Sequence, residues 1–369
     1  MGSRSNSGHS ASGLRVLFAT NHAYLPDHKG GSEVSTHDLC LTLKEQGVAV
    51  GVMSALLPRA SLSAHRLIPL LLRPRDGFVH DDSLGYPVFR CKRPAHAARM
   101  VVDNFRPDVV VIQAGRPLAL VDSFTSVGVP CAIYLRDASF DDLGGPVVER
   151  DGVRYVATSR DLARRFGEAF GIHPLSIPPI VRPGRYRVES SRKNVTFVCP
   201  FPAKGVDIAL GLAARRPDIP FVIVESWEMH PLRRAILKTR IRRRSNILHH
   251  RPIDDMRNVY RETRILLMPS RVPEGWGRVV SEVQLSGIPV LGSRLGGLPE
   301  SIGPGGILVE KWSRIDEWEG KLAQMWDDPV EYERLAVRAR LHAERAEFMP
   351  EAIVARLLPV LSELAGTRT

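Results

Sequence analysis

The chain has 369 residues, of which 44% are hydrophobic and 25% charged, with a formal net charge of +11. This length exceeds what one hydrophobic core usually supports, so two domains are expected. No apolar run approaches the roughly eighteen residues that span a bilayer, which argues against a transmembrane helix. The positive charge attracts anions such as nucleotide diphosphates, acidic lipid headgroups or nucleic acid.

Residues 1–12 are small and polar and lack the apolar core of a signal peptide, so they predict a disordered tail. Four cysteines, Cys40, Cys91, Cys131 and Cys199, lie far apart and form no C-x-x-C pair. Cys40, Cys131 and Cys199 fall in apolar contexts, which predicts buried, reduced thiols and a cytoplasmic protein.

Short apolar runs alternate with amphipathic segments over residues 13–180, which predicts a Rossmann-like domain built from βα units. Ser32 is expected to cap the first helix, which would end at Gly47. The strands of this domain are expected at residues 14–19, 48–53, 108–112, 131–135 and 155–157.

A proline-rich stretch at residues 178–183 interrupts this pattern, and residues 181–193 are interpreted as a linker. A second Rossmann-like domain is predicted over residues 194–345, and residues 346–369 predict a C-terminal amphipathic helix. The strands of the second domain are expected at residues 194–199, 221–224, 265–268, 290–291 and 306–309.

Two glutamates, Glu274 and Glu282, lie eight positions apart around the turn formed by Gly275, Trp276 and Gly277. The turn opens an amphipathic helix, whose free N–H groups suit a phosphate. Glu282 lies about 7 Å further along the helix axis than the turn. One ligand could therefore present a sugar ring to the first glutamate, a diphosphate to the turn and a ribose to the second, as a nucleotide sugar does.

With the adjoining segments 286–291 and 296–300, this region resembles the Glu-x7-Glu motif of the family-4 retaining glycosyltransferases, which have the GT-B fold. The resemblance implies an α/β protein of two Rossmann-like domains facing a central cleft, with a C-terminal helix that returns to the first domain. It further implies that Glu274 contacts the donor sugar and Glu282 the ribose. The first domain would bind the acceptor and the second the donor.

There are two further motifs, one after the first strand of each predicted domain. Gly30 and Gly31 resemble the family's Gly-Gly-x-Glu loop, where the backbone approaches the donor closely. Lys204, followed by Gly205, resembles the family's Lys-Gly motif, whose lysine neutralises the donor diphosphate.

The sequence departs from the family pattern at two places. Residues 199–200 are Cys-Pro where the family typically has Gly-Arg, and Arg136 stands where the family often has histidine. Our hypothesis is that Arg136 or Arg278 supplies the second positive charge on the diphosphate, because a guanidinium binds phosphate bidentately. The alternative is that Arg136 pairs with Asp137 or Asp141.

No cofactor or metal is expected besides the nucleotide-sugar substrate. The chain contains no Asp-x-Asp triplet and no spaced His/Cys cluster, which favours a metal-independent mechanism. It also lacks the complete glycine-rich fingerprints of nicotinamide-binding and P-loop proteins.

Three further segments lie outside these motifs. Residues 225–227 (Glu-Ser-Trp) follow a predicted strand and would either form a bulky edge of the donor cleft or pack on the surface. Residues 233–244 form a basic, helix-like run, and residues 65–75 are basic and leucine-rich. Solvated surface is the plain interpretation of both runs; alternatively, residues 65–75 contact an anionic membrane.

The predicted function is transfer of a sugar from a nucleotide-diphosphate sugar to an acceptor hydroxyl with retention of configuration, with Glu274, Lys204 and Arg136 as catalytic residues. The acceptor is unidentified, either a glycan or a lipid-linked molecule, and the protein would be cytoplasmic, with peripheral contact at the inner face of the membrane. A nucleotide-sugar epimerase and a non-catalytic nucleotide-sugar-binding relative remain alternatives. Nucleic acid is not expected as a partner, because the basic residues are not interleaved with stacking aromatic side chains.

Overall fold

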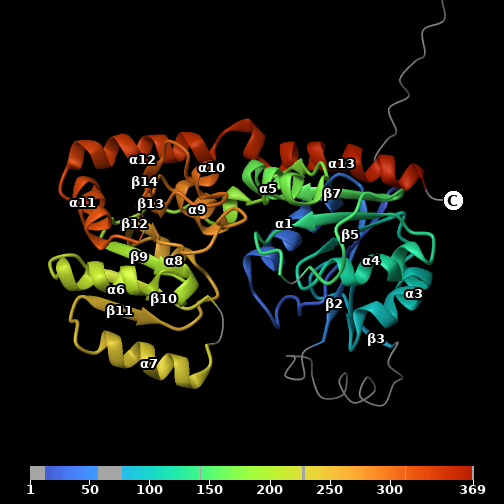
Figure 1. Ribbon diagram of the computed structural model, residues 1–369, viewed down its shortest axis with the longest axis horizontal. Helices are drawn as coiled ribbons and strands as arrows, with labels where there is room; N and C mark the ends of the chain where they lie inside the picture. Colours follow the sequence, from blue (N-terminus) through green and yellow to red (C-terminus); the bar gives the residue numbers. More distant parts are fainter. Residues whose placement is uncertain (1–12, 57–76, 142, 227–228, 312, 368–369) are drawn as a thin grey trace, which may run out of the picture.

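The computed structural model describes residues 13–56, 77–141, 143–226, 229–311 and 313–367. It contains two β-sheets that stand side by side along the long axis of the molecule (Figure 1). Each sheet has a hydrophobic core on both of its faces. The protein is therefore built from two α/β domains, each with its own hydrophobic core.

The first sheet has the strand order β3-β4-β2-β1-β5-β6-β7-β8 and is parallel except for the antiparallel β3–β4 pair. Its strands are β1 (Arg15–Ala19), β2 (Ala49–Ala55), β3 (Phe78–Asp81), β4 (Val88–Cys91), β5 (Val109–Gln113), β6 (Cys131–Leu135), β7 (Val153–Ala157) and β8 (Leu175–Ser176). Its helices are α1 (Gly31–Glu45), α3 (Pro94–Phe105), α4 (Leu118–Thr125) and α5 (Arg160–Phe170). The strand order reverses direction between β1 and β5, so the carboxyl ends of these strands border the crevice in which such sheets bind ligands.

The second sheet is entirely parallel, with the order β11-β10-β9-β12-β13-β14. Its strands are β9 (Asn194–Val198), β10 (Phe221–Val224), β11 (Ile247–His250), β12 (Thr263–Met268), β13 (Val290–Ser293) and β14 (Gly306–Val309). Its helices are α6 (Val206–Arg215), α7 (Pro231–Ile241), α8 (Arg257–Tyr260), α9 (Arg278–Gln284), α10 (Leu298–Ile302), α11 (Ile315–Trp326) and α12 (Pro329–Ala343). Here the order reverses between β9 and β12, which places the second ligand crevice after these two strands.

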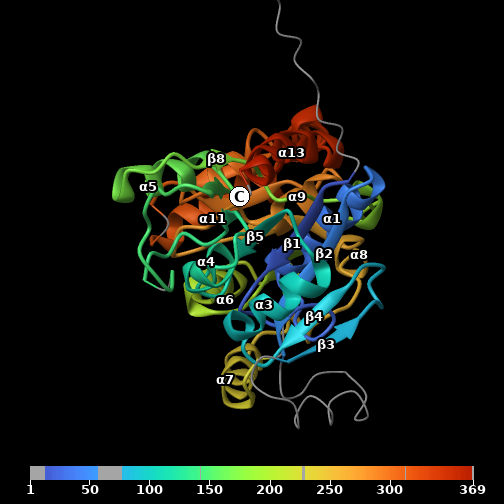
Figure 2. The ribbon, with the colours of Figure 1, turned by 90° about the vertical axis from the view of Figure 1, so that its right-hand side faces the viewer.

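The last helix, α13 (Pro350–Gly366), leaves the second domain and packs on the first. Figure 2 shows it beside α1. Five buried side chains of α13 join the core formed by β1, β2 and β5: Ile353, Val354, Leu357, Leu361 and Leu364. The C-terminal helix thus returns to the first domain, as the sequence predicts.

The predicted strands at residues 131–135, 221–224 and 306–309 coincide with β6, β10 and β14. Four strands were not predicted: β3, β4, β8 and β11. β3, β8 and β11 lie at sheet edges, and none of the four exceeds four residues, so their hydrophobic pattern is too brief to detect.

One helix start differs from the prediction. Gly30, with an extended backbone, is the N-cap of α1, and Ser32 lies inside its first turn. The Ser32 hydroxyl donates to the carboxylate of Glu33 instead of accepting from the backbone. The predicted Ser32 cap is therefore wrong, because the helix begins at Gly31 and Ser32 already lies within it.

All four cysteines are buried free thiols. In the part of the chain that the structure describes, no helix combines the length and apolarity that a membrane crossing requires. The basic leucine-rich segment 65–75 lies outside the described residues.

Candidate functional site

Glu274 and Lys204 meet at the carboxyl ends of the second sheet. The Lys204 ammonium donates to both carboxylate oxygens of Glu274, at 2.6 and 2.7 Å, and the Ser270 hydroxyl donates to the same carboxylate. Lys204 is 31% exposed and Glu274 11%, so the pair is partly shielded from water. The structure therefore brings together two residues that lie 70 positions apart in the sequence.

The backbone around this pair explains the glycines of both motifs. Lys204 ends a short 3₁₀ turn, and Gly205 follows with a left-handed φ of 79°. A Cβ on Gly205 would collide with the carbonyl oxygen of Pro269, at the end of β12. Glu274 forms a β-bridge with Gly296, and its carbonyl accepts from the Gly297 N–H at 2.7 Å. Backbone contacts thus fix the positions of the chain at both charged residues.

Glu282 is buried in α9. Its carboxylate accepts from the Tyr260 hydroxyl at 2.5 Å and forms an ion pair with Arg278 on the preceding turn. Burial raises the pKa of Glu282, although the Arg278 charge opposes this effect. The second glutamate of the motif therefore belongs to an internal polar network, one turn or more inside the helix.

Arg278 connects this network to the first domain. Its guanidinium donates to the Asp38 carboxylate of α1 at 2.6 Å and to the Tyr186 hydroxyl at 3.0 Å. Asp38 is fully buried and also accepts from Arg185 at 2.7 Å. Two carboxylates already engage the charge of Arg278, although its Nε, like the Nη2 of Arg136, is buried without a partner among the described residues. That Arg278 neutralises a diphosphate stays a prediction. Sequence reasoning missed Asp38, whose partner lies 240 positions away.

Arg136, at the end of β6, is the better candidate for the second phosphate cation. Its Nε donates to Gln113 at 2.7 Å, and its guanidinium stacks 4.1 Å from the Tyr134 ring centroid. Its Nη2 is buried and has no hydrogen-bond partner among the described residues. The alternative pairing with Asp137 or Asp141 is not observed. An unsatisfied buried N–H group is costly, so an anion that accepts from it would be bound favourably.

The turn at residues 275–277 lies directly against Arg136. A Cβ on Gly275 would collide with the Arg136 carbonyl oxygen, and the Gly275 carbonyl accepts from the Thr158 hydroxyl at 3.1 Å. Gly277 is the N-cap of α9, with a φ of 84°. The two domains therefore touch at the turn that the motif predicts to bind phosphate.

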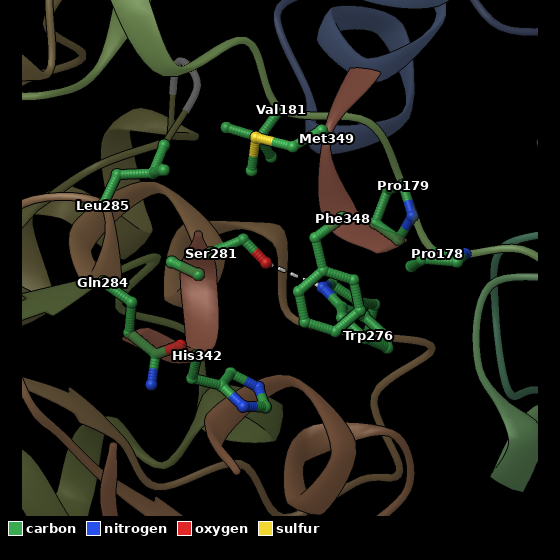
Figure 3. Close-up of a pocket in the computed structure, with 11 residues that line it drawn as sticks. Pro178, Pro179, Val181, Trp276, Ser281, Gln284, Leu285, His342, Phe348 and Met349 are labelled. Atoms are coloured by element: carbon green, nitrogen blue, oxygen red, sulfur yellow. Dashed lines mark hydrogen bonds between the residues drawn. The ribbon is translucent and has the colours of Figure 1, made fainter. Parts of the chain in front are cut away.

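Trp276 does not place its indole beside this turn's backbone, as a donor-binding side chain would. Figure 3 shows the indole facing Phe348 and the prolines of the interdomain crossover, in a small cavity of about 20 Å³. Its Nε1 donates to the Ser281 hydroxyl at 2.9 Å, and its ring lies edge-on to Phe348 at 5.6 Å. Pro178 and Pro179 line the same cavity. The indole is thus engaged by the crossover, and the predicted contact of Trp276 with the donor stays a prediction for its backbone N–H group.

The first-domain loop places a buried carboxylate beside the two glycines. Gly30 lies next to Glu33, and Gly31 begins α1, with Arg278 its nearest neighbour. His22 and His28 each approach Glu33 to 3.9 Å. Burial opposes ionisation of Glu33, yet the neighbouring imidazoles of His22 and His28 leave its pKa lowered. Nothing in the spacing of these two histidines distinguishes them in the sequence.

Of residues 225–227, whose role at the cleft edge stays a prediction, the structure gives the ion pairs of Glu225. Glu225 is buried and pairs with Arg234 of α7 at 2.7 Å and with His249 of β11 at 3.1 Å. It therefore anchors a helix. Trp227 lies outside the described residues.

Comparison with known proteins places this geometry in context. Residues 192–342 match the family model described as glycosyl transferases group 1. A GDP-mannose-dependent monoacylated alpha-(1-6)-phosphatidylinositol monomannoside mannosyltransferase of Corynebacterium glutamicum is 27% identical over 78% of this chain and 86% of its own length. A D-inositol 3-phosphate glycosyltransferase of Rhodococcus erythropolis is 30% identical, over 55% of this chain and about half (52%) of the relative.

Solved structures agree on the architecture. Sucrose-phosphate synthase from Thermosynechococcus elongatus superposes with a TM-score of 0.77 at 14% identity, covering 96% of this chain and 99% of that one. Anabaena HepE in complex with UDP-glucose has a TM-score of 0.73 at 18% identity, covering 95% and 100%. The fold is GT-B, which confirms the predicted fold class. The family match and the relatives' names together support a glycosyltransferase.

Proposed function

We propose that this protein is a family-4 retaining glycosyltransferase that moves a sugar from a nucleotide-diphosphate sugar to an acceptor hydroxyl. The observation that carries the proposal is the Lys204–Glu274 pair, which lies at the ligand crevice of the second sheet, with the motif's turn packed on Arg136. The spacing of Glu274 and Glu282 would be the Glu-x7-Glu motif. The relatives named above act as mannosyl- and glycosyltransferases, which favours transfer over the epimerase and binding-only alternatives.

Each candidate residue then has a distinct task. Lys204 and the unpartnered Nη2 of Arg136 would hold the diphosphate, and Glu274 would accept hydrogen bonds from hydroxyls of the donor sugar. Glu282 would bind the ribose through the carboxylate that Tyr260 and Arg278 orient. The backbone of residues 275–277, with Gly30 and Gly31 opposite, would complete the phosphate site.

The proposed reaction proceeds on one face of the sugar. The bond between the anomeric carbon and the diphosphate oxygen breaks, the acceptor oxygen bonds to the same face, and the leaving phosphate oxygen takes the acceptor's proton. The protein's main contribution is to stabilise the charge that develops on the diphosphate, through preorganised cations. This mechanism needs no carboxylate base and no metal ion.

Thermal-shift measurements with UDP, GDP, ADP, dTDP and their sugars test the donor assignment. A bound donor at 100 times its Kd should stabilise the folded protein by about 2.7 kcal/mol. Transfer to a panel of glycan and lipid-linked acceptors, with the anomeric configuration of the product determined by NMR, then tests the reaction. The proposal fails if no nucleotide stabilises the protein or if the product has inverted configuration.

A further inference from the structure

Helix α7 is attached to the second domain by one face only. Leu237 and Ile241 are buried in the domain core, and Arg234 forms the ion pair with the buried Glu225. Figures 1 and 2 both show α7 at the lower margin of the described molecule, beyond the sheet edge formed by β11. One side of α7 is therefore fixed rigidly while the other faces outward.

The outward face of α7 carries large aliphatic side chains. Leu232 is 65% exposed and Ile236 54% exposed, and a spacing of four residues places both on the same face of a helix. Leu248, on the adjoining edge strand β11, is 53% exposed. The pair Val337 and Leu341 on α12 is equally exposed at the same spacing, so exposure alone does not distinguish Leu232 and Ile236. What distinguishes α7 is that its apolar pair lies on a segment with a large excess of cations.

The same segment carries an uncompensated positive charge. Residues 231–244 contain seven cations and no aspartate or glutamate. Of these, Arg234 is paired with Glu225, whereas the other six form no ion pair with any residue that the structure describes. These six are Arg233, Lys238, Arg240, Arg242, Arg243 and Arg244. Six such charges on one short segment account for a large share of the chain's net charge of +11 and attract anions from outside the molecule.

We propose that α7 is an interfacial docking helix that seats the second domain on an anionic lipid bilayer. Leu232 and Ile236 would enter the boundary between headgroups and acyl chains, and the six cations would pair with the lipid phosphates. Nucleic acid shares the phosphates but offers no apolar phase to the two aliphatic side chains, and α7 carries no aromatic residue that could stack on bases. An anionic bilayer offers an apolar interior to the two aliphatic side chains and phosphates to the six cations.

Co-sedimentation with vesicles tests this inference without reference to catalysis. The full chain should bind vesicles of phosphatidylglycerol and phosphatidylcholine at low salt, bind pure phosphatidylcholine weakly, and dissociate as salt rises. The variant Arg240→Glu, Arg242→Glu, Arg243→Glu should lose more than 100-fold in partitioning, because each cation near such a surface is worth about fivefold. Leu232→Ser with Ile236→Ser should bind at least tenfold more weakly at every salt concentration.

Helices and loops elsewhere in the second domain supply matched controls. Lys311→Glu, Arg314→Glu, Arg338→Glu makes the same change in net charge at exposed positions outside α7. Val337→Ser with Leu341→Ser removes two exposed aliphatic side chains from α12, 58% and 63% exposed, at the same spacing. Both controls should bind as wild type does.

The proposal is overturned if the wild-type chain does not bind anionic vesicles, or if the control variants lose as much binding as the α7 variants. Preference for single-stranded nucleic acid over vesicles would equally overturn it. Melting temperatures of all variants establish that they are folded. Since the readout needs neither donor nor acceptor, a failure here is distinguishable from a failure of the proposed transferase activity.

Discussion

At the scale of single residues, Lys204 and Glu274 neutralise each other through two short hydrogen bonds in a place that is partly shielded from water. A diphosphate would compete with Glu274 for the lysine, and sugar hydroxyls would compete with the lysine for Glu274. A donor that supplies both groups at once exchanges one charged pair for two charge-assisted interactions. The pair is thus preorganised for a ligand with this combination of groups.

The first prediction follows from this exchange. Glu274→Gln should lower kcat by about 10²–10³, because contacts with the reacting sugar strengthen in the transition state. The donor KM should stay constant or fall, because Lys204 is released to the diphosphate. Steady-state kinetics measure both, with Glu310→Gln, an exposed glutamate paired with Arg294, as the matched control. Wild-type kinetics in the Glu274 variant would rule out its role.

The second prediction concerns Glu282. Glu282→Gln should mainly raise the donor KM, because ribose binding contributes equally to the ground state and the transition state. Tyr260→Phe keeps the carboxylate but removes the hydroxyl that donates to it at 2.5 Å, so it should raise the donor KM less. A large fall in kcat at unchanged KM would contradict the assignment.

His342 provides a prediction for stability. Burial, with the nearby Arg345 charge, lowers its pKa from 6.5 to about 4. The unfolded chain therefore binds more protons than the folded protein between these pH values, so stability is lost as pH falls from 6.5 towards 4. The loss from this residue between pH 7.5 and pH 5 should be about 2 kcal/mol. Urea unfolding measures it, and His342→Gln should reduce the pH dependence by that amount; an unchanged slope would be inconsistent with a neutral buried histidine.

At the scale of elements, polar contacts from helices and from the ends of strands join the two domains. Thr158, after β7, donates to Gly275, and Asp38 of α1 pairs with Arg278 of α9. Glu300 of α10 accepts from the first N–H groups of α5, those of Arg160 and Asp161, at 3.1 and 2.7 Å. A carboxylate at a helix N-terminus is favoured by the orphan donors and by the helix dipole. Polar contacts of this kind hold the two halves of the site in register.

The fourth prediction tests the buried interdomain pair. Asp38→Asn should destabilise the protein by about 1.5–3 kcal/mol, because it removes one of the two carboxylates that accept from the buried Arg278, which keeps Glu282 as its counter-charge. Asp122→Asn is the matched control, since Asp122 pairs with Arg150 at 2.9 Å while 85% exposed. This control should cost less than about 1 kcal/mol. Equal losses in the two variants, measured by urea unfolding, would show that the Asp38 contact is not a buried ion pair in solution.

At the scale of the whole molecule, the chain crosses between domains twice, once through the prolines near residue 178 and once before α13. Pro178, Trp276 and Phe348 line one cavity where the two crossovers meet (Figure 3). The motif that carries the proposed chemistry is therefore packed on the connection between the domains. A substitution at Trp276 would therefore first disturb the packing between the two domain crossovers.

The fifth prediction concerns metal ions. If Lys204 and Arg136 supply the charge that stabilises the leaving diphosphate, transfer should retain most of its rate in excess EDTA. Initial rates before and after chelation measure this, with heat-inactivated enzyme as the background control. A complete loss of activity that Mg²⁺ or Mn²⁺ restores would refute the metal-independent mechanism.

Local patterns in the sequence determined much of the architecture. The alternation of buried runs and amphipathic segments predicts β6, β10 and β14 to the residue, because strands buried on both faces leave continuous apolar runs. The spacing of Glu274 and Glu282 around a glycine turn predicts one glutamate before a helix and one inside it, as found. The return of the C-terminal helix follows from the resemblance to the family.

The tertiary structure alone decided which charges meet. Arg278 lies beside Glu282 by helical spacing, but its contact with Asp38 joins residues 240 positions apart, which no local period encodes. For the same reason the sequence could not show that Trp276 turns towards the interdomain crossover, or that Arg136 keeps a buried donor without a partner. Helix and strand periods report the faces of one element, whereas a site at a domain boundary depends on how two independently patterned surfaces pack together.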